Sequence, residues 1–507
     1  MHLVRHLWWL PLVLLCSAVP ACRKDPQTEA PDSNTAHERS VPKATERPLP
    51  EARDSSAAPK ASGPNVILIS IDTLRPDHLG CYGYQRDTSP AIDRIASEGV
   101  LFENTISSSS WTLPAHAALF SSLPDSVHGC VETDRLLDAG IVTLAERFAE
   151  AGYVTAGFFA GPYLHPVFGL GQGFGHYENC TSYRKTIDSQ PAAKWAMNHT
   201  ILRASHQDIT NPTVYQAVRR WLKDNRRSPF FLFIHLWDVH FDFIPPEPYR
   251  SKFDPDYRGS VTGEDFFYDP SINASMDPRD LKHLIALYDG EIAWTDAHVA
   301  KIYDDLRADG LLDSTVLAIT ADHGTEFFEH GAKSHRATLF DEVVRIPLIV
   351  RFPSKLPGGA RVTAQTRIID IGPTLLDLAG LPKPEGVMGH SLVSLARGKM
   401  LDFNNQAICE LFSVGRRIRA IRTLDGKLID NLGKDRRYYF NLQTDPIEHR
   451  PLHTWTDPLG QSLLTAYRAT LDDLATAISN RQSSSDAPSI PADVLKQLQS
   501  LGYVGGE

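Results

Sequence analysis

The chain has 507 residues, of which 42% are hydrophobic and 22% are charged, an ordinary globular composition that excludes a fibrous repeat or wholesale disorder. Its 51 Lys and Arg residues against 61 Asp and Glu residues give a formal net charge of −10, so we expect no nucleic-acid partner. Six cysteines are too few to act as the main scaffold of a chain this long.

The first 22 residues have the pattern of an export signal. Arg5 precedes an apolar run over residues 7–19, which is shorter than the roughly 20 residues of a membrane-spanning helix. The run ends in the segment VPAC at residues 19–22, and small residues before a cysteine resemble a bacterial lipobox. We therefore expect Cys22 to become the lipidated first residue. The alternative is ordinary signal cleavage near Ala21.

Residues 23–63 have the composition of a flexible tether. They are rich in Pro, Ala, Ser, Glu and Lys and poor in aromatic residues, so they cannot bury a core. Together with Cys22 they predict an exported protein of the cell envelope, either periplasm-facing or an outer-membrane lipoprotein, that meets the membrane through an N-terminal lipid anchor. Export permits disulfides among the remaining thiols, with free buried thiols as the alternative; these are Cys81, Cys130, Cys180 and Cys409.

Apolar, β-branched segments alternate with amphipathic helical segments between residues 64 and 400. The predicted strands cover residues 65–71, 154–159, 230–236, 315–320 and 346–351, and the predicted helices cover 89–98, 141–151, 212–225, 280–309 and 369–379. Continuous apolar strands suit a sheet that is covered on both faces. The alternation therefore predicts an α/β fold with a large mixed, mostly parallel sheet flanked by helices.

The pattern changes near residue 400. Short strands are predicted at residues 406–411, 418–423, 427–430 and 438–442, followed by helices over 460–480 and 491–503. Turn residues such as those at 425–426 join the strands, which is typical of an antiparallel sheet. We expect residues 401–507 to form a small C-terminal α+β subdomain beside a catalytic domain of residues 64–400.

Three groups of polar residues follow predicted strands directly. Asp72 follows the first strand, His240 follows the strand that begins at Phe230, and the pair Asp322-His323 follows the strand over 315–320. Functional groups of open α/β sheets gather beyond the carboxyl ends of the strands. Carboxylates and imidazoles that meet there suit a divalent metal ion, although each residue alone is as well explained by a cap or a buried polar group.

Thr112 lies where a Ser-rich loop enters an Ala-rich helix. A helix N-terminus attracts negative charge through its free N–H groups and its dipole. A hydroxyl at this place, bound to a metal, is suited to act as a nucleophile. The alternative is that Thr112 only caps the helix.

These motifs together resemble the sulfatase family of the alkaline-phosphatase superfamily. The resemblance runs from about residue 65 to the C-terminus. It rests on the segments NVILISIDTLRPDHLGCYGY, TLPAHAALFSSLPDSVHG, AGYVTAGFF, ITADHGTEFFEHG, LFDEVVRIPLIVRFP, IDIGPTLLDLAGL and YYFNLQTDPIEHRPL. The family fold, a large α/β domain with a small antiparallel subdomain, agrees with the predicted elements.

The resemblance implies a role for each matching residue. Metal ligands would be Asp72, Thr112, Asp322 and His323, with Thr112 at the position of the nucleophile. His240 would contact the transferred group, and His335 would protonate the leaving group or bind a second metal. Charge on the oxygens of the transferred group would be neutralised by Arg75, His116, Lys333 and Arg336.

The chain also departs from the family pattern. Thr112 stands where the family has the Cys or Ser that is oxidised to formylglycine, His116 replaces the Arg of that motif, and Thr73 replaces the second Asp of the usual pair. Formylglycine is therefore not expected. The divalent ion would be Zn, Mn or Ca, and the histidines at 323 and 335 favour Zn or Mn.

The loss of formylglycine affects the expected chemistry. A Thr ester of sulfate cannot be released by collapse to an aldehyde, whereas a Thr ester of phosphate is open to metal-assisted attack by water. We expect a metal-dependent hydrolase of sulfate or phosphate-type esters that acts by in-line attack of metal-bound Thr112 on a small-molecule, glycan or lipid ester. The alternatives are a transferase that moves a phospho-group onto an envelope lipid or glycan, and a non-catalytic binding protein of the same fold.

Overall fold

The computed structural model describes residues 62–181, 206–399, 405–413, 415–452, 457–482 and 489–490. The predicted signal segment, nearly all of the predicted tether and the helix expected over 491–503 lie outside these ranges. Among the described residues, no helix is long and apolar enough to span a bilayer. The four cysteines that the structure describes are not bridged to one another.

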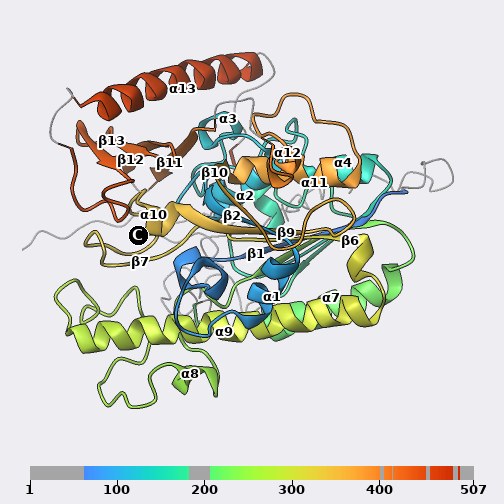
Figure 1. Ribbon diagram of the computed structural model, residues 1–507, viewed down its shortest axis with the longest axis horizontal. Coiled ribbons are helices and arrows are strands. Elements are labelled where there is room, and N and C mark those ends of the chain that lie inside the picture. Colours follow the sequence, from blue (N-terminus) through green and yellow to red (C-terminus); the bar gives the residue numbers. More distant parts are fainter. Residues whose placement is uncertain are drawn as a thin grey trace, which may run out of the picture. The chain divides into compact units, whose positions relative to one another are not determined.

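A large sheet of eight strands forms the centre of the fold (Figure 1). Its strands, in spatial order, are β10 (Ala360–Arg367), β2 (Val100–Ile106), β9 (Arg345–Arg351), β6 (Thr315–Thr320), β1 (Asn65–Ile71), β5 (Phe230–Leu236), β3 (Val154–Phe159) and β4 (His176–Asn179). All neighbouring pairs are parallel except those that β9 makes with β2 and β6. The predicted mixed, mostly parallel sheet is confirmed.

Helices cover both faces of this sheet. One face carries α1 (Pro90–Glu98), α7 (Asn211–Asn225) and the long α9 (Pro278–Ala308), and the other carries α2 (Thr112–Ser121), α4 (Leu144–Glu150), α11 (Ile371–Ala379) and α12 (Val393–Ala396) (Figure 1). Shorter helices are α3 (Asp125–His128), α8 (Tyr249–Lys252) and α10 (Asp341–Val344). All ten residues of α2 are buried, which agrees with its Ala-rich, almost uncharged sequence.

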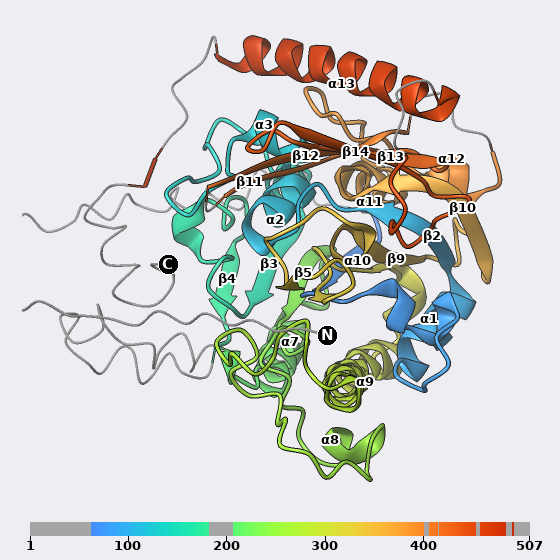
Figure 2. The ribbon, with the colours of Figure 1, turned by 90° about the vertical axis from the view of Figure 1, so that its left-hand side faces the viewer.

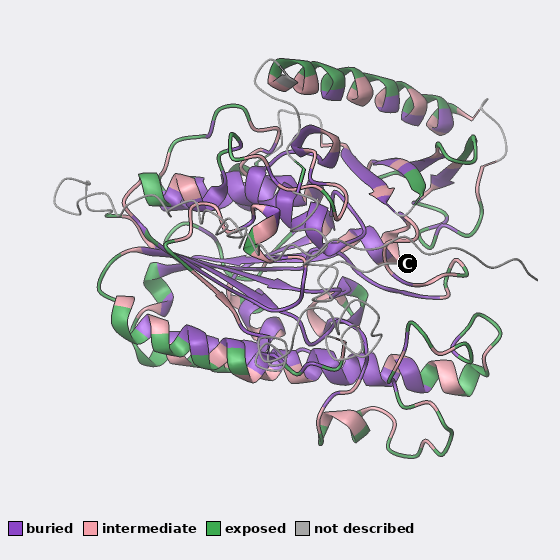
Figure 3. Cartoon of the chain, turned by 180° about the vertical axis from the view of Figure 1, so that it is seen from behind, coloured by how far each residue is buried: buried purple, intermediate pink, exposed green. Residues whose placement is uncertain are grey.

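The predicted antiparallel sheet of the C-terminal part is also confirmed. It contains β11 (Ala407–Ser413), β12 (Arg416–Arg422), β13 (Gly426–Asn431) and β14 (Arg436–Asn441), and α13 (Pro458–Gln482) packs along it (Figure 2). Figure 3 shows the central strands of the large sheet buried and the long C-terminal helix exposed on its outer side. A two-stranded antiparallel sheet of β7 (Glu326–Phe327) and β8 (Lys333–Ser334) follows β6 in the chain.

The register of the central strands positions polar side chains in rows. Ser70 of β1 pairs with His235 of β5 on one side and with Thr320 of β6 on the other. Side chains two positions apart on a strand point to the same face. Asp72 and Asp322, which come two positions after Ser70 and Thr320, therefore follow this row at the carboxyl edge of the sheet.

Candidate active site

Two carboxylates lie at the carboxyl edge of the central strands. The backbone N–H groups of Thr73 and His323 donate to Asp322 Oδ1 at 3.3 and 2.8 Å, so this oxygen is already bonded within the loop. The backbone N–H of Asp72 donates to the carbonyl of Leu236 at 2.9 Å, which fixes the end of β1 against β5. Both carboxylates are completely buried.

Thr112 is the first residue of α2, and its hydroxyl faces this pair. Thr112 Oγ1 lies 3.4 Å from Asp72 Oδ2 and 3.3 Å from His323 Nε2. His323 Nδ1 donates to the carbonyl of Gly324 at 2.8 Å, so the lone pair of its Nε2 is directed at the cluster. His323 Nε2 is also 3.3 Å from Asp322 Oδ2. The structure thus brings together the four predicted metal ligands Asp72, Thr112, Asp322 and His323.

The distances within this cluster fit a bound divalent ion. Ligands about 2.0–2.1 Å from a zinc ion are about 3.3 Å apart in a tetrahedral shell, and three of the ligand-to-ligand distances are 3.3–3.4 Å. Asp72 Oδ1 and Asp322 Oδ2 are buried without a hydrogen-bond partner among the described residues. Buried unpaired carboxylate oxygens are costly, and a cation would compensate both.

Burial dominates the ionisation of the ion-free cluster. It raises the pKa of Asp72 to about 7, against the opposing effects of the His323 imidazole and the Thr112 hydroxyl. A divalent cation would return this carboxyl to its ionised form, because a nearby positive charge favours the carboxylate.

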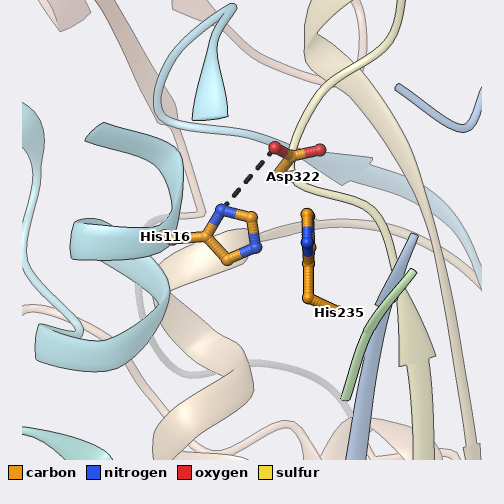
Figure 4. Close-up of side chains that lie close together, drawn as sticks. All are labelled: His116, His235 and Asp322. Carbon is orange, nitrogen blue, oxygen red and sulfur yellow. Dashed lines mark ion pairs between the residues drawn. The ribbon is translucent and has the colours of Figure 1, made fainter. Parts of the chain in front are cut away.

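Two further imidazoles lie beneath the cluster (Figure 4). His116 lies one turn along α2 from Thr112, and its Nδ1 is 3.6 Å from Asp322 Oδ2. His235 projects from β5, and its Nε2 is 3.4 Å from Asp72 Oδ2. Burial lowers the pKa of both histidines to about 4. His235 was missed in the sequence, although a His inside the apolar strand FLFIHL is itself a signal.

His240 and His335 line one side of the cluster. The His335 ring lies 4.5 Å from the His323 ring and 5.0 Å from the His240 ring, centroid to centroid. The His240 ring stacks at 3.9 Å on Trp237. Burial first, and then the neighbouring imidazoles, lower the pKa of both residues well below the ordinary value. The two rings are therefore neutral at pH 7.

His335 is held by an unusual backbone. Its neighbours Ser334 and Arg336 have φ angles of 73° and 61°, in the left-handed region that side chains seldom adopt. The N–H of Arg336 donates to the carbonyl of Ser110 at 2.9 Å, which ties this segment to the entrance of α2. Such strain persists only where the surrounding structure enforces it, and it concentrates at functional sites.

Three predicted substrate-binding side chains have other partners in the structure. The Arg75 guanidinium pairs with Asp77 and Glu329 at 2.7 and 2.6 Å, and Lys333 Nζ donates to two carbonyl groups at 3.1 and 2.7 Å. The Arg336 guanidinium lies 4.0 Å from the Trp111 ring centroid and donates to Ser413 Oγ. None of these three cations is brought into the cluster, so their binding of substrate stays a prediction.

Comparisons with known proteins match most of the described chain. The family model described as Sulfatase matches residues 64–381, and a second, described as N-sulphoglucosamine sulphohydrolase, C-terminal, matches residues 328–476. The uncharacterized sulfatase YidJ of Escherichia coli is 26% identical over 416 residues, which cover 76% of this chain and 82% of that protein. An N-acetylglucosamine-6-O-sulfatase of Bacteroides thetaiotaomicron is 23% identical over 465 residues, with the same two coverages.

Solved structures share the fold. A phosphonate monoester hydrolase of Agrobacterium radiobacter superposes with a TM-score of 0.66 at 22% identity, over 82% of this chain and 95% of that one.

Proposed function

Because this chain belongs to the sulfatase family of ester hydrolases, we propose that it hydrolyses a phosphate-type or sulfate ester with Thr112 as the nucleophile. The observation that carries the proposal is the position of Thr112. Its hydroxyl lies at the N-terminus of a buried helix and within 3.4 Å of both Asp72 and His323. A residue that only capped the helix would not need two metal-type ligands beside its hydroxyl.

Family members use a divalent metal ion, and the donors of this cluster suit one. The ion would be held by Asp72, Asp322, His323 and Thr112. It would supply positive charge that favours the ionised hydroxyl of Thr112 and neutralises oxygens of the ester. The nitrogen donor His323 favours Zn or Mn over Ca.

The residues of the chain then have distinct tasks. Thr112 Oγ attacks the phosphorus or sulfur atom, the bond to the leaving oxygen breaks, and water later hydrolyses the ester on Thr112. The N-terminus of α2 favours the negative charge of the transferred group. Burial holds the pKa of His240 and His335 well below the ordinary value, and the negative charge of a bound ester would favour their protonated forms, so either ring would be placed to give a proton to the leaving oxygen.

Phosphorus esters are favoured over sulfate esters as substrates. With threonine at position 112 there is no aldehyde to expel sulfate, so release requires attack of water on the transferred group. This step is standard at phosphorus. The N-acetylglucosamine-6-O-sulfatase among the relatives supports a glycan as the alcohol part of the ester.

We also propose that the protein acts in the cell envelope, held there by a lipid on Cys22. The support is the sequence pattern of residues 1–22 and the tether-like composition that follows. Cys22 lies outside the described residues. A glycan or lipid ester of the envelope would be within reach of such an anchored enzyme.

A substrate panel tests the catalytic part of the proposal. Zinc- or manganese-loaded protein is assayed with an aryl sulfate, a phosphate monoester, a phosphate diester and a phosphonate monoester. We expect turnover of a phosphorus ester, loss of activity in Thr112→Ala, and a covalent adduct on Thr112 in quenched wild-type protein. Thr155→Val, which removes another buried hydroxyl far along the chain, is the matched control. Full activity of Thr112→Ala would refute the nucleophile, and turnover of aryl sulfate alone would refute the preference for phosphorus.

A further inference from the structure

Two neighbouring aromatic side chains, Phe267 and Tyr268, are exposed near the histidines of the candidate site. Their exposed fractions are 48% and 37%. Of all the Phe, Tyr and Trp side chains in the described part of the chain, these two alone are exposed. Exposed apolar surface that is gathered in one place marks a binding site more often than isolated exposed residues do.

A continuous series of ring contacts leads from Thr112 to this pair. His323, whose Nε2 is 3.3 Å from Thr112 Oγ1, has its ring 4.5 Å from the His335 ring. The His335 ring lies 5.5 Å from that of Phe241, which in turn lies 5.9 Å from Phe267 and almost parallel to it. His335 is partly exposed, whereas Thr112 is buried, so the site is open to solvent on the side of His335. A leaving group that extends from the nucleophile towards solvent can therefore reach Phe267.

Hydrogen bonds on both sides of the aromatic pair fix its backbone. The N–H of the buried Phe266 donates to Asp242 Oδ1 at 2.9 Å. The Lys333 ammonium donates to the carbonyl groups of Asp269 and Ile272 at 3.1 and 2.7 Å. Lys333 belongs to β8, which leads directly into the strained segment described above, so the same segment serves the site and the aromatic pair. A surface that is fixed before a ligand arrives loses little conformational entropy on binding.

The pair forms a corner with little positive charge. The rings of Phe267 and Tyr268 lie 5.3 Å apart with an angle of 85° between their planes. The carboxylates of Glu264, Asp265 and Asp269 belong to residues within three positions of Phe267. Nearby carboxylates disfavour a ligand group that is itself negatively charged. The corner therefore suits an uncharged ring with an apolar face.

We propose that Phe267 and Tyr268 bind the alcohol part of the ester, and that this part is an uncharged ring, either an aryl group or a sugar. The ring packs on Phe267 in the corner that Tyr268 closes, while the oxygen that joins it to the transferred group stays near His335. Packing of a ring on an aromatic side chain contributes about 2- to 10-fold in affinity. This inference rests on the ester hydrolysis proposed above and specifies its leaving group.

The test compares the wild type with Phe267→Ala, Phe267→Leu and the control Phe253→Ala. Phe253 follows α8, on the outer side of α9, where Arg86 and Lys252 lie 5.9 and 5.0 Å from its ring centroid (Figure 1). The values of kcat and KM are measured for three esters of the acid that the substrate panel selects. These are a 2-naphthyl ester, a glucose 6-ester and an ethyl ester, which carry an aryl ring, a sugar ring and no ring. Thermal melting of each variant checks folding.

We expect Phe267→Ala to raise the KM of a ring ester by about 2- to 10-fold with little change in kcat, as removal of a binding contact does. Its KM for the ethyl ester should not change, and Phe253→Ala should match the wild type throughout. Phe267→Leu keeps apolar bulk and should lose less than Phe267→Ala. A loss seen with the naphthyl ester alone would identify an aryl leaving group, and a loss seen with the glucose ester alone would identify a sugar.

Other outcomes would overturn the inference. An equal rise in KM for the ethyl ester would show that Phe267 acts only through the structure of the site. Unchanged KM for both ring esters in a folded Phe267→Ala, or in Phe267→Leu if the alanine variant did not fold, would exclude the contact. A wild type that turned over only the ethyl ester would do the same. A wild type that turned over no ester of the panel would overturn the proposed function as well.

Discussion

Replacement of Lys427 by methionine tests how the small sheet is joined to the catalytic part. Lys427 lies on β13 and is completely buried. Its Nζ is 2.9 Å from Asp341 Oδ1 and 3.0 Å from Glu448 Oε1. Asp341 begins α10, whose Val343 carbonyl accepts the N–H of Gly324 at 3.0 Å. The ammonium group is thus linked through α10 to the loop that carries Asp322 and His323.

The expected loss of stability follows from the two contacts. At 3 Å and an effective dielectric constant of 20, each pair is worth about 5 kcal/mol before desolvation is subtracted. Removal of one partner from a buried ion pair typically costs about 3–5 kcal/mol, because the other charge is left uncompensated. Asp341 keeps Arg422 at 2.9 Å, so most of the cost falls on Glu448. Burial already raises the pKa of Glu448 to about 7 despite Lys427.

We therefore expect Lys427→Met to lower the free energy of unfolding by about 3–5 kcal/mol in urea at pH 8. The double variant Lys427→Met/Glu448→Gln should recover part of this loss, because no unpaired carboxylate remains. Lys434→Met, at an exposed lysine, is the control and should change stability by less than about 0.5 kcal/mol. The reasoning would be refuted if Lys427→Met were as stable as the wild type. It would also be refuted if the losses caused by the two substitutions simply added in the double variant.

Three shorter predictions concern the metal, a helix end and pH. Chelation should abolish activity and lower the melting temperature, with recovery on addition of zinc or manganese; unchanged melting would contradict a structural contribution of the ion. Asp238→Ala should lower the free energy of unfolding by about 3 kcal/mol in denaturant titrations. The reason is that the Asp238 carboxylate accepts hydrogen bonds from Thr210, Asn211 and Trp294 at 2.6–3.1 Å. A loss under about 1 kcal/mol would argue against a stabilising role of these bonds. Burial lowers the pKa of His330, but the contact of 2.6 Å with Glu342 outweighs it and the pKa is raised. The resulting stability is present below pH 6.5 and is lost as the pH rises through the folded pKa, so His330→Gln should destabilise more at pH 5.5 than at pH 8.5, as judged by melting curves.

Local patterns predicted the buried strands well and the edges of the sheet less well. The predicted strands over 154–159, 230–236 and 315–320 have the observed bounds of β3, β5 and β6. The strands β2 and β10 were not predicted. Their sequences VLFENTI and ARVTAQTR mix polar and apolar residues because each is covered less evenly, and a polar strand resembles a loop. The antiparallel direction of β9 depends on chain routing, which no local pattern encodes.

The sequence predicts the site residues that directly follow strands. It does not predict those whose place in the site depends on the direction of the side chain. Asp72 and Asp322 had to meet because parallel strands end at one edge of the sheet. Arg336, next to His335 in sequence, is turned to Trp111 and Ser413 by a left-handed backbone that its sequence does not reveal. His235 was missed because its position beside Asp72 depends on the register of β5 against β1, a long-range pairing.

The burial of every residue of α2 has a consequence for how the protein moves. Amide hydrogens of a helix that has no face in contact with water exchange only when a large part of the fold opens. Thr112 therefore cannot approach a substrate by local breathing of its own helix. The adjustments that accompany binding must come from more exposed segments, such as the one around the half-exposed Phe267, whose ring lies 5.9 Å from that of Phe241 beside His335. Hydrogen exchange during turnover should then slow in that segment and leave α2 unchanged.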